Sequence, residues 1–228
     1  MKHSNPATSY LNKAKRDPQY MIKDRQEIVA YLKRQNIVPF DSVIDFQLNY
    51  SGLELTIPGK PGSTFYARLF SQTDLASNKE IEQIKIKGRS YFFCGDHATA
   101  QFWFVLSETG EICTYDNHEE SVNPIYSSIQ HLIENYVVEI SQYENNMYEL
   151  PPYFNLKDNA AFRELTANAI INPKAGDCYN HWCIVDNNIR IHKGTWFDRP
   201  AAYIHIYGES KATCDTFVRS LKAKGIID

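Results

Sequence analysis

Residues 101–115 read QFWFVLSETGEICTY, and this stretch decides the fold class. Its first part, Gln101–Leu106, is apolar on both faces, as is typical of a central strand that is covered on both sides. Glu108–Gly110 supplies a turn, and Ile112–Tyr115 supplies a second strand. The stretch therefore predicts a β-hairpin in the interior of an antiparallel sheet.

A helix is predicted on either side of this hairpin. Residues 41–50 have helical apolar spacing and end at Ser51–Gly52, where a glycine suits the left-handed residue that closes a helix. Pro124 precedes a second, amphipathic helix over residues 129–140, for which Ser127 and Gln130 form a capping box. Alternating patterns predict further strands at residues 53–57, 64–70, 84–87 and 91–94. We expect an α+β fold, with helices packed on an antiparallel sheet.

The chain divides into three parts by composition. Residues 1–20 are polar and predict a loose N-terminal arm, and residues 21–150 form the α+β domain, with a first helix capped by Asp24. The sequence changes character at Tyr148–Pro152, so residues 151–228 are predicted to be a small C-terminal α+β segment. That segment carries a helix after Asp158, a hairpin over residues 181–192, a strand at 202–207 and a helix over 214–221.

The compartment is predicted from what the sequence lacks. No apolar run approaches the roughly 20 residues that span a bilayer. The first six residues, MKHSNP, show no apolar region of a signal peptide. The five cysteines are an odd number and are scattered, which indicates reduced thiols. We expect a cytoplasmic protein without a membrane partner.

The net charge of −3 hides a strong segregation of charge. Residues 37–150 hold six Lys and Arg against sixteen Asp and Glu, a net charge of about −10. An acidic region of this size repels nucleic acid and anionic lipid and attracts a basic protein. The plain alternative is an acidic surface that only keeps the protein in solution. We expect a basic protein partner and no nucleic acid.

The part of the chain from residue 39 to residue 140 resembles the SUKH superfamily of SMI1/KNR4-like proteins. That family combines a helix ending in glycine, an antiparallel sheet, a strand–glycine–strand segment and a last helix that follows a proline. Here the helix end reads DFQLNYSGL (residues 45–53), with Ser51 at the family's first glycine. The strand segment reads FWFVLSETGEI (residues 102–112), and Asn123–Pro124 introduces the last helix.

The resemblance implies a protein that binds rather than catalyses. Bacterial members of the family are mostly immunity proteins, which bind and neutralise toxins that are often nucleases. Fungal members are regulators that act as interaction scaffolds. The resemblance covers less than half of the chain and implies nothing about residues 151–228. We expect an immunity protein of a polymorphic toxin system, and the regulatory scaffold is the alternative.

Two short segments have spacings close to those of metal ligands. Cys94 and His97 form one Cys-x-x-His pair, and Cys178, His181 and Cys183 form the other set. Zinc needs four ligands, and no second pair is placed to complete either site. We therefore expect no metal and no cofactor, with Cys183 as a core residue.

The same residues suggest a hydrolase as a further alternative. Cys178 would be the nucleophile and His181 or His192 the base, with Asp177 or Asp186 to orient it. A reactive thiolate needs a cationic neighbour or a helix N-terminus, and the sequence places neither beside Cys178. Phosphate-binding and nucleophile-elbow motifs are also missing from the sequence. We do not expect an enzyme.

The aromatic residues of the central strands are interpreted as core. Trp103 and Phe104 are expected to lie in a central strand, and Trp103→Ala to remove a large core side chain. Leu132 and Val137 are expected to pack on that sheet. Loop residues are the candidates for partner contacts, since binding residues concentrate in loops. They are Asp96, Asp116, Glu119 and Glu120, followed by Trp196 and Arg199.

Overall fold

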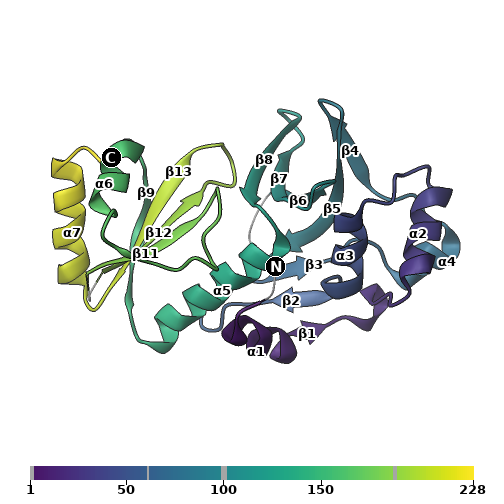
Figure 1. Ribbon diagram of the computed structural model, residues 1–228, viewed down its shortest axis with the longest axis horizontal. Helices are drawn as coiled ribbons and strands as arrows, with labels where there is room; N and C mark the ends of the chain where they lie inside the picture. Colours follow the sequence, from purple (N-terminus) through teal and green to yellow (C-terminus); the bar gives the residue numbers. More distant parts are fainter. Residues whose placement is uncertain (1–2, 61, 99–101, 187–188) are drawn as a thin grey trace.

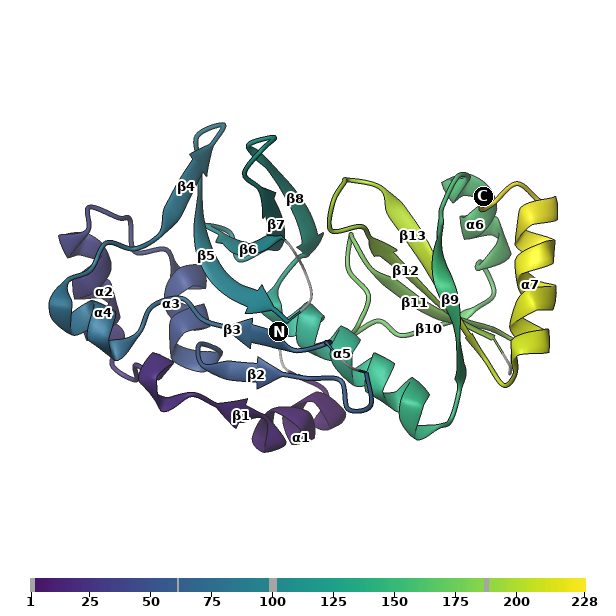
Figure 2. The ribbon, with the colours of Figure 1, turned by 180° about the vertical axis from the view of Figure 1, so that it is seen from behind.

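The computed structural model describes residues 3–60, 62–98, 102–186 and 189–228. Within them the strands form two antiparallel sheets, and the long helix α5 (Ile129–Glu144) lies between the sheets (Figure 1). Seen from behind, the same arrangement places the first sheet with the N-terminal helices on one side of α5 and the second sheet on the other (Figure 2). The fold is α+β, as the sequence predicts.

The first sheet has eight strands in the order β1-β2-β3-β5-β6-β7-β8, and β4 pairs with β5 beside this path. Its strands are β1 (Lys15–Arg16), β2 (Leu53–Leu55), β3 (Phe65–Ala67), β4 (Gln83–Ile86), β5 (Arg89–His97), β6 (Trp103–Ser107), β7 (Ile112–Asp116) and β8 (Ser121–Tyr126). The helices of this part are α1 (Asn5–Lys13), η1 (Pro18–Tyr20), α2 (Arg25–Arg34), α3 (Asp41–Asn49) and α4 (Gln72–Ser77).

The predicted hairpin is the pair β6 and β7, in the interior of this sheet. Phe104 and Leu106 face the helices and pack in one buried cluster with Leu132 and Ile133 of α5. Val105 is buried on the opposite face, which explains why the strand reads as apolar on both sides. Gln101 lies outside the described residues. The central strand and the helix packed on it are confirmed.

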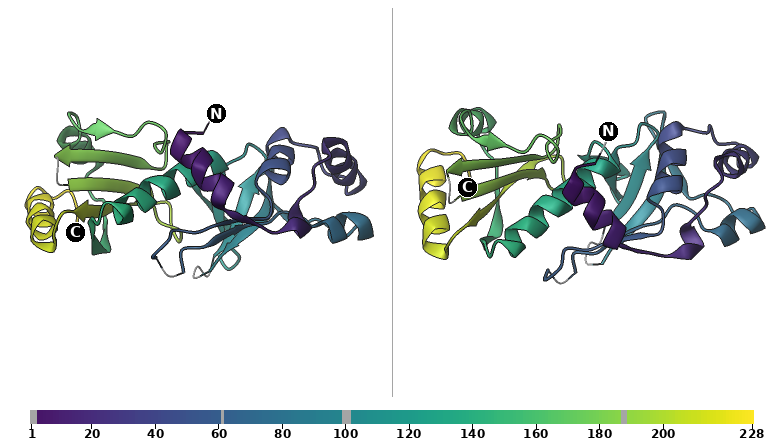
Figure 3. Two further views of the ribbon diagram at one scale, coloured as in Figure 1. Left: turned by 90° about the horizontal axis from the view of Figure 1, so that it is seen from below. Right: turned by 60° about the horizontal axis from the view of Figure 1, so that its bottom comes forward.

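The second sheet has five strands in the order β10-β11-β12-β13-β9. They are β9 (Tyr148–Asn155), β10 (Ile170–Ile171), β11 (His181–Asp186), β12 (Ile189–Thr195) and β13 (Ala202–Gly208). The helices α6 (Asn159–Leu165) and α7 (Lys211–Ala223) pack on one face through Phe162, Val218 and Leu221. The other face contacts α5, where Val138 packs on Trp182 and Tyr207. Figure 3 shows α7 on the outer side of this sheet and α5 on the inner side.

The prediction of a loose N-terminal arm is wrong for residues 3–20, the part of it that the structure describes. Ser4 caps α1, and its backbone N–H and its hydroxyl both donate to the carboxylate of Glu134, at 2.7 Å each. The strand β1 then extends the sheet by pairing with β2. A tertiary hydrogen bond to α5 fixes this segment, and local composition does not reveal it.

The entry to α5 also differs from the prediction. Pro124 lies inside β8, a strand that the sequence did not predict, at the end of the sheet where a missing N–H costs no ladder bond. The N-cap is Ser128, whose hydroxyl accepts from the backbone N–H of His131 at 3.3 Å, so Ser127 and Gln130 are not the capping box.

Trp103 is not a core residue. Its side chain is 51% exposed, whereas that of Phe104 is 1% exposed. Successive side chains of a strand point to opposite faces, so Trp103 points away from the helices. It lies at the first position of β6, beyond the buried Val105 on the same face. Its principal ring contact is Phe93, with the ring centroids 4.9 Å apart.

Trp103 and Phe104 are neighbours in β6 that differ in exposure, so their alanine variants should differ in stability. Trp103→Ala should lower the free energy of unfolding by about 1 kcal/mol or less, because half of the ring is already in water. Phe104→Ala should lower it by about 3–5 kcal/mol through a large core cavity. Urea denaturation of both variants measures the difference. Equal losses would place Trp103 in the core and contradict the structure.

Candidate functional site

The first candidate site is the face of the first sheet that the helices leave uncovered, which we call the open face. Tyr91, Val105 and Cys113 form its buried floor, with Phe93 and Tyr115 packed around them. Figures 1 and 2 show the β4–β5 and β7–β8 hairpins rising beside each other at the edges of this region. Residues for a partner are therefore presented on a rigid sheet.

The predicted acidic residues lie on the two sides of Trp103. Trp103 pairs with Tyr115 across β6 and β7, and Tyr115 is followed by Asp116 and the turn that holds Glu119 and Glu120. On its other side, Trp103 and Asp96 line one hollow of about 310 Å³. The predicted acidic contacts thus flank an exposed tryptophan, which the sequence analysis had placed in the core.

The hollow beside Trp103 carries excess negative charge. Its acidic lining residues are Asp74, Glu80, Glu82 and Asp96, and its basic ones are Arg68 and Lys79. Lys79 lies 3.6 Å from Asp74, and Arg68 stacks over Tyr66 at 4.9 Å. Within the described residues, Glu80, Glu82 and Asp96 form no ion pair. Their charge is left available to a partner.

The turn at residues 116–120 is held by one of its own acids. The Asp116 carboxylate accepts the backbone N–H of His118 at 2.8 Å and of Glu119 at 3.3 Å. Asp116 is therefore a structural residue of the turn, and its replacement would disturb the local backbone. Glu119 and Glu120 are exposed and can be changed without this cost.

Trp196 and Arg199 lie elsewhere, in the loop between β12 and β13. This loop crosses to the first sheet, where Thr114 Oγ1 donates to the carbonyl of Phe197 at 2.6 Å. Asn123 Nδ2 donates to the carbonyls of Trp196 at 2.6 Å and Arg199 at 3.1 Å. The loop fastens the two sheets together, and the structure does not bring it to the acidic residues.

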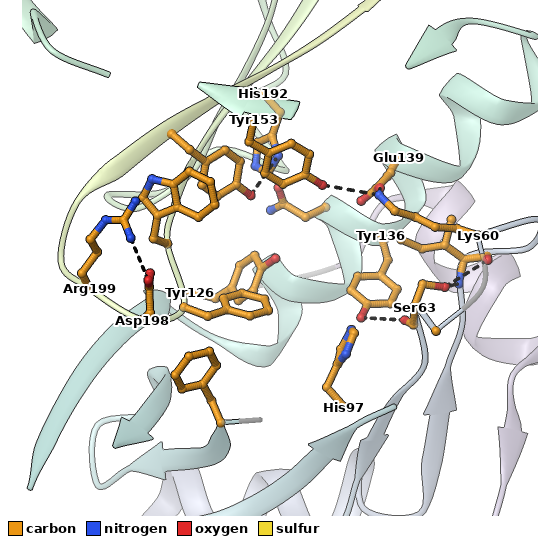
Figure 4. A pocket seen from close by; sticks show the side chains of 17 residues that line it. Lys60, Ser63, His97, Tyr126, Tyr136, Glu139, Tyr153, His192, Asp198 and Arg199 are labelled. Atoms are coloured by element: carbon orange, nitrogen blue, oxygen red, sulfur yellow. Dashed lines mark hydrogen bonds and ion pairs between the residues drawn. The ribbon is translucent and has the colours of Figure 1, made fainter. Parts of the chain in front are cut away.

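A second candidate site is a cavity of about 480 Å³ between the two sheets and α5 (Figure 4). Aromatic side chains are its main walls. Among its 17 described lining residues they are Phe102, Tyr126, Tyr136, Tyr153, Trp196, Phe197 and Tyr203. Of the residues singled out from the sequence, Trp196, Arg199, His97 and His192 line this cavity, and none of them was expected to meet the others there. The abundance of Tyr, at 15 copies, was the only signal, because the walls come from distant segments.

One wall of the cavity contains Lys60 and Glu139, which belong to a partly buried charge network. Lys60 Nζ donates to Glu139 and lies 3.2 Å from Glu149. Glu149 also accepts from the Tyr143 hydroxyl, and His205 Nε2 lies 3.2 Å away from it. Burial raises the pKa of Glu149, but the close contact with His205, the hydrogen bond from the Tyr143 hydroxyl and the charge of Lys60 outweigh it and lower the pKa to about 2. Burial in turn lowers the pKa of His205, which is neutral near pH 7.

The cysteine and histidine candidates do not assemble into a site. His181 and Cys183 face α6, where the His181 ring contacts Phe162, whereas His192 lies on the opposite face of the sheet and stacks on Trp182 at 4.3 Å. Cys178 is exposed, and burial, followed by the charge of Asp177, raises the pKa of its thiol. That direction is opposite to what an activated nucleophile needs.

The remaining candidates have structural positions. Asp177 accepts the backbone N–H groups of Ser127, Tyr179 and Asn180, so its carboxylate holds a loop. The side chain of Asp186 lies outside the described residues. Cys94 is buried in the core, and burial raises its pKa well above the ordinary value. In the part of the chain that the structure describes, no three His, Cys, Asp or Glu residues gather as they would around a metal ion.

No protein-family model, curated protein or solved structure matches the chain. No described helix is long and apolar enough to cross a membrane. The assignment of function therefore depends on the two sites themselves.

The charge network makes stability depend on pH. Because folding lowers the pKa of Glu149 from 4.5 to about 2, its contribution is complete above pH 4.5 and is lost as the pH falls toward 2. Glu149→Gln should lower the free energy of unfolding at pH 7 by up to about 3 kcal/mol. The deficit relative to the wild type should shrink below pH 4.5.

Denaturation series from pH 7 to pH 2.5 measure this effect. The matched control is Glu144→Gln, because Glu144 is an exposed glutamate at the end of α5, five residues before Glu149 in the chain. A deficit for Glu149→Gln that stays constant with pH would show that the carboxylate charge contributes nothing.

Proposed function

We propose that this chain is a non-enzymatic binding protein that captures a basic protein partner on the open face of its first sheet. The observation that carries the proposal is Trp103, a half-exposed tryptophan on a face that no helix covers. Tryptophan is the residue most enriched among the side chains that dominate binding energies. A side chain of this kind, left in water on a rigid sheet, is suited to a partner.

The charge around Trp103 favours the basic nature of that partner. Asp96 and Glu82 lie on one side, and the exposed Glu119 and Glu120 lie on the other. Charges at the rim of an interface act mainly on the rate of association, since they attract the partner before contact is made. Trp103 and the aromatic side chains beside it would then keep the dissociation of the complex slow.

We further propose that the partner is a toxin and that the chain is its immunity protein in the cytoplasm. The resemblance to the SUKH superfamily supports this more specific role, because its bacterial members neutralise toxins by binding them. A nuclease toxin presents a basic surface to nucleic acid. The acidic open face is complementary to such a surface.

The experiment first looks for the toxin gene that the proposal expects next to this gene, and then measures the rate of association of its toxin domain with this chain over a range of salt concentrations. The rate should fall as ionic strength rises, because salt screens charges beyond about 10 Å at 0.1 M. The double variant Glu119→Lys and Glu120→Lys should slow association by roughly tenfold at low salt. Asp116 is retained so that the turn keeps its hydrogen bonds.

Two further variants separate charge from contact. Trp103→Ala should accelerate dissociation by tenfold or more, with little effect on association. The matched control reverses Glu144 and Glu164, which are exposed and lie outside the open face, and should change neither rate. No complex, or rates unaffected by both open-face variants, would overturn the proposal.

A further inference from the structure

The cavity between the sheets has no role in binding at the open face. Its lining comes from α5, from the first sheet and from the second sheet, and Tyr126, Tyr136 and Tyr153 project into it from different sides (Figure 4). Its volume of about 480 Å³ lies within the range of small-molecule sites. A mostly aromatic wall with a few polar groups is the usual composition of such a site.

The charged residues of the lining are matched in pairs. Lys60 is held by Glu139 and Glu149, and Arg199 Nη1 donates to Asp198 at 2.7 Å. The second carboxylate beside Lys60, Glu149, lies outside the lining. An anion that entered the cavity would find no free cation there, and burying an unpaired ion is costly. The lining therefore favours an uncharged molecule.

The polar groups on the floor of the cavity are neutral as well. Asn180 Nδ2 donates to the carbonyl of Ile125 at 2.8 Å, which turns its Oδ1 toward His192 Nε2 at 3.2 Å. Nε2 must then carry the proton, and Nδ1 is the acceptor that faces the Tyr203 hydroxyl at 3.5 Å. Burial lowers the pKa of His192 well below its ordinary value, so the imidazole is neutral near pH 7.

One hydroxyl in the cavity is left to a ligand. Among the side chains drawn in Figure 4, none makes a hydrogen bond with the Tyr126 hydroxyl, whereas the Tyr136 hydroxyl donates to the carbonyl of Ser63 at 3.1 Å. Burial raises the pKa of Tyr126, so the group remains protonated and can donate. A ligand that offers an acceptor to this hydroxyl would gain a hydrogen bond inside an aromatic enclosure.

We propose that this cavity binds an uncharged heteroaromatic compound of nucleoside size, stacked among the tyrosine and tryptophan rings, with a ring acceptor for the Tyr126 hydroxyl. A flat base gains affinity by stacking on an aromatic side chain, whichever base it is. Tyr153 and Tyr203 already stack on each other at 4.8 Å and Arg199 lies over Trp196 at 4.8 Å, whereas Tyr126 and Tyr136 make no ring contact among the described residues. The enclosure therefore offers these two rings to a ligand, and it favours a flat ring over a saccharide of the same volume.

The test titrates the protein with adenosine and uridine, and with their 5′-monophosphates as charged counterparts, by calorimetry. At least one nucleoside should bind, and its monophosphate should bind at least tenfold more weakly. Tyr126→Phe removes one hydroxyl and should weaken nucleoside binding by roughly five- to tenfold. Tyr115→Phe on the open face is the matched control and should leave the affinity unchanged.

Different results would contradict different parts of the proposal. Binding of neither nucleoside, or tighter binding of a monophosphate than of its nucleoside, would overturn the proposal. Binding of methyl glucoside in place of the nucleosides would overturn the heteroaromatic class. Tyr126→Phe should leave association with the basic partner unchanged, so that this site and the open face are tested separately.

Discussion

The arrangement of the whole molecule depends on buried hydrogen bonds that α5 makes with the second sheet. Asn135 is 3% exposed, and its amide Oδ1 accepts the indole N–H of Trp182 at 2.5 Å while its Nδ2 donates to the carbonyl of Ala175 at 2.8 Å. Two turns later, Gln142 accepts from Arg190 at 2.7 Å. Polar groups buried without partners would each cost about 1–3 kcal/mol, so these bonds specify one way for the second sheet to sit on the helix.

Because α5 packs against both sheets, its side chains form part of the wall of the cavity between them. Tyr136 and Glu139 point into the cavity, and the loop at residues 196–199 closes the far side by binding to Thr114 and Asn123 of the first sheet. The open face is on the opposite side of the first sheet from α5 and does not share these residues. The molecule can therefore present a charged surface to a protein and a neutral enclosure to a small molecule at the same time.

Much of the fold follows from local patterns in the sequence. The β6–β7 hairpin, the helix caps at Asp24 and Asp158 and the β11–β12 pairing were all predicted correctly, because periodicity and turn residues specify them. The helix α1 was missed because the partner of its cap, Glu134, is 130 residues away. Trp103 was misassigned because the sequence of an apolar strand shows which residues are hydrophobic but not which of them other residues cover. Only the tertiary structure shows that the side chain of Trp103 is half exposed. The cavity was missed for the same reason, since its walls meet only after both sheets have packed on α5.

Burial shifts the pKa values of several titratable groups of this protein toward their neutral forms. Burial raises the pKa of the Cys178 thiol and of the tyrosines that line the cavity, and it lowers the pKa of His192 and His205. All of these shifts favour the neutral form of the group. For the Cys178 thiol this direction is opposite to that of an activated thiolate nucleophile. Among the described residues, Glu80, Glu82 and Asp96 beside Trp103 form no ion pair, which suits the recognition role proposed for the open face.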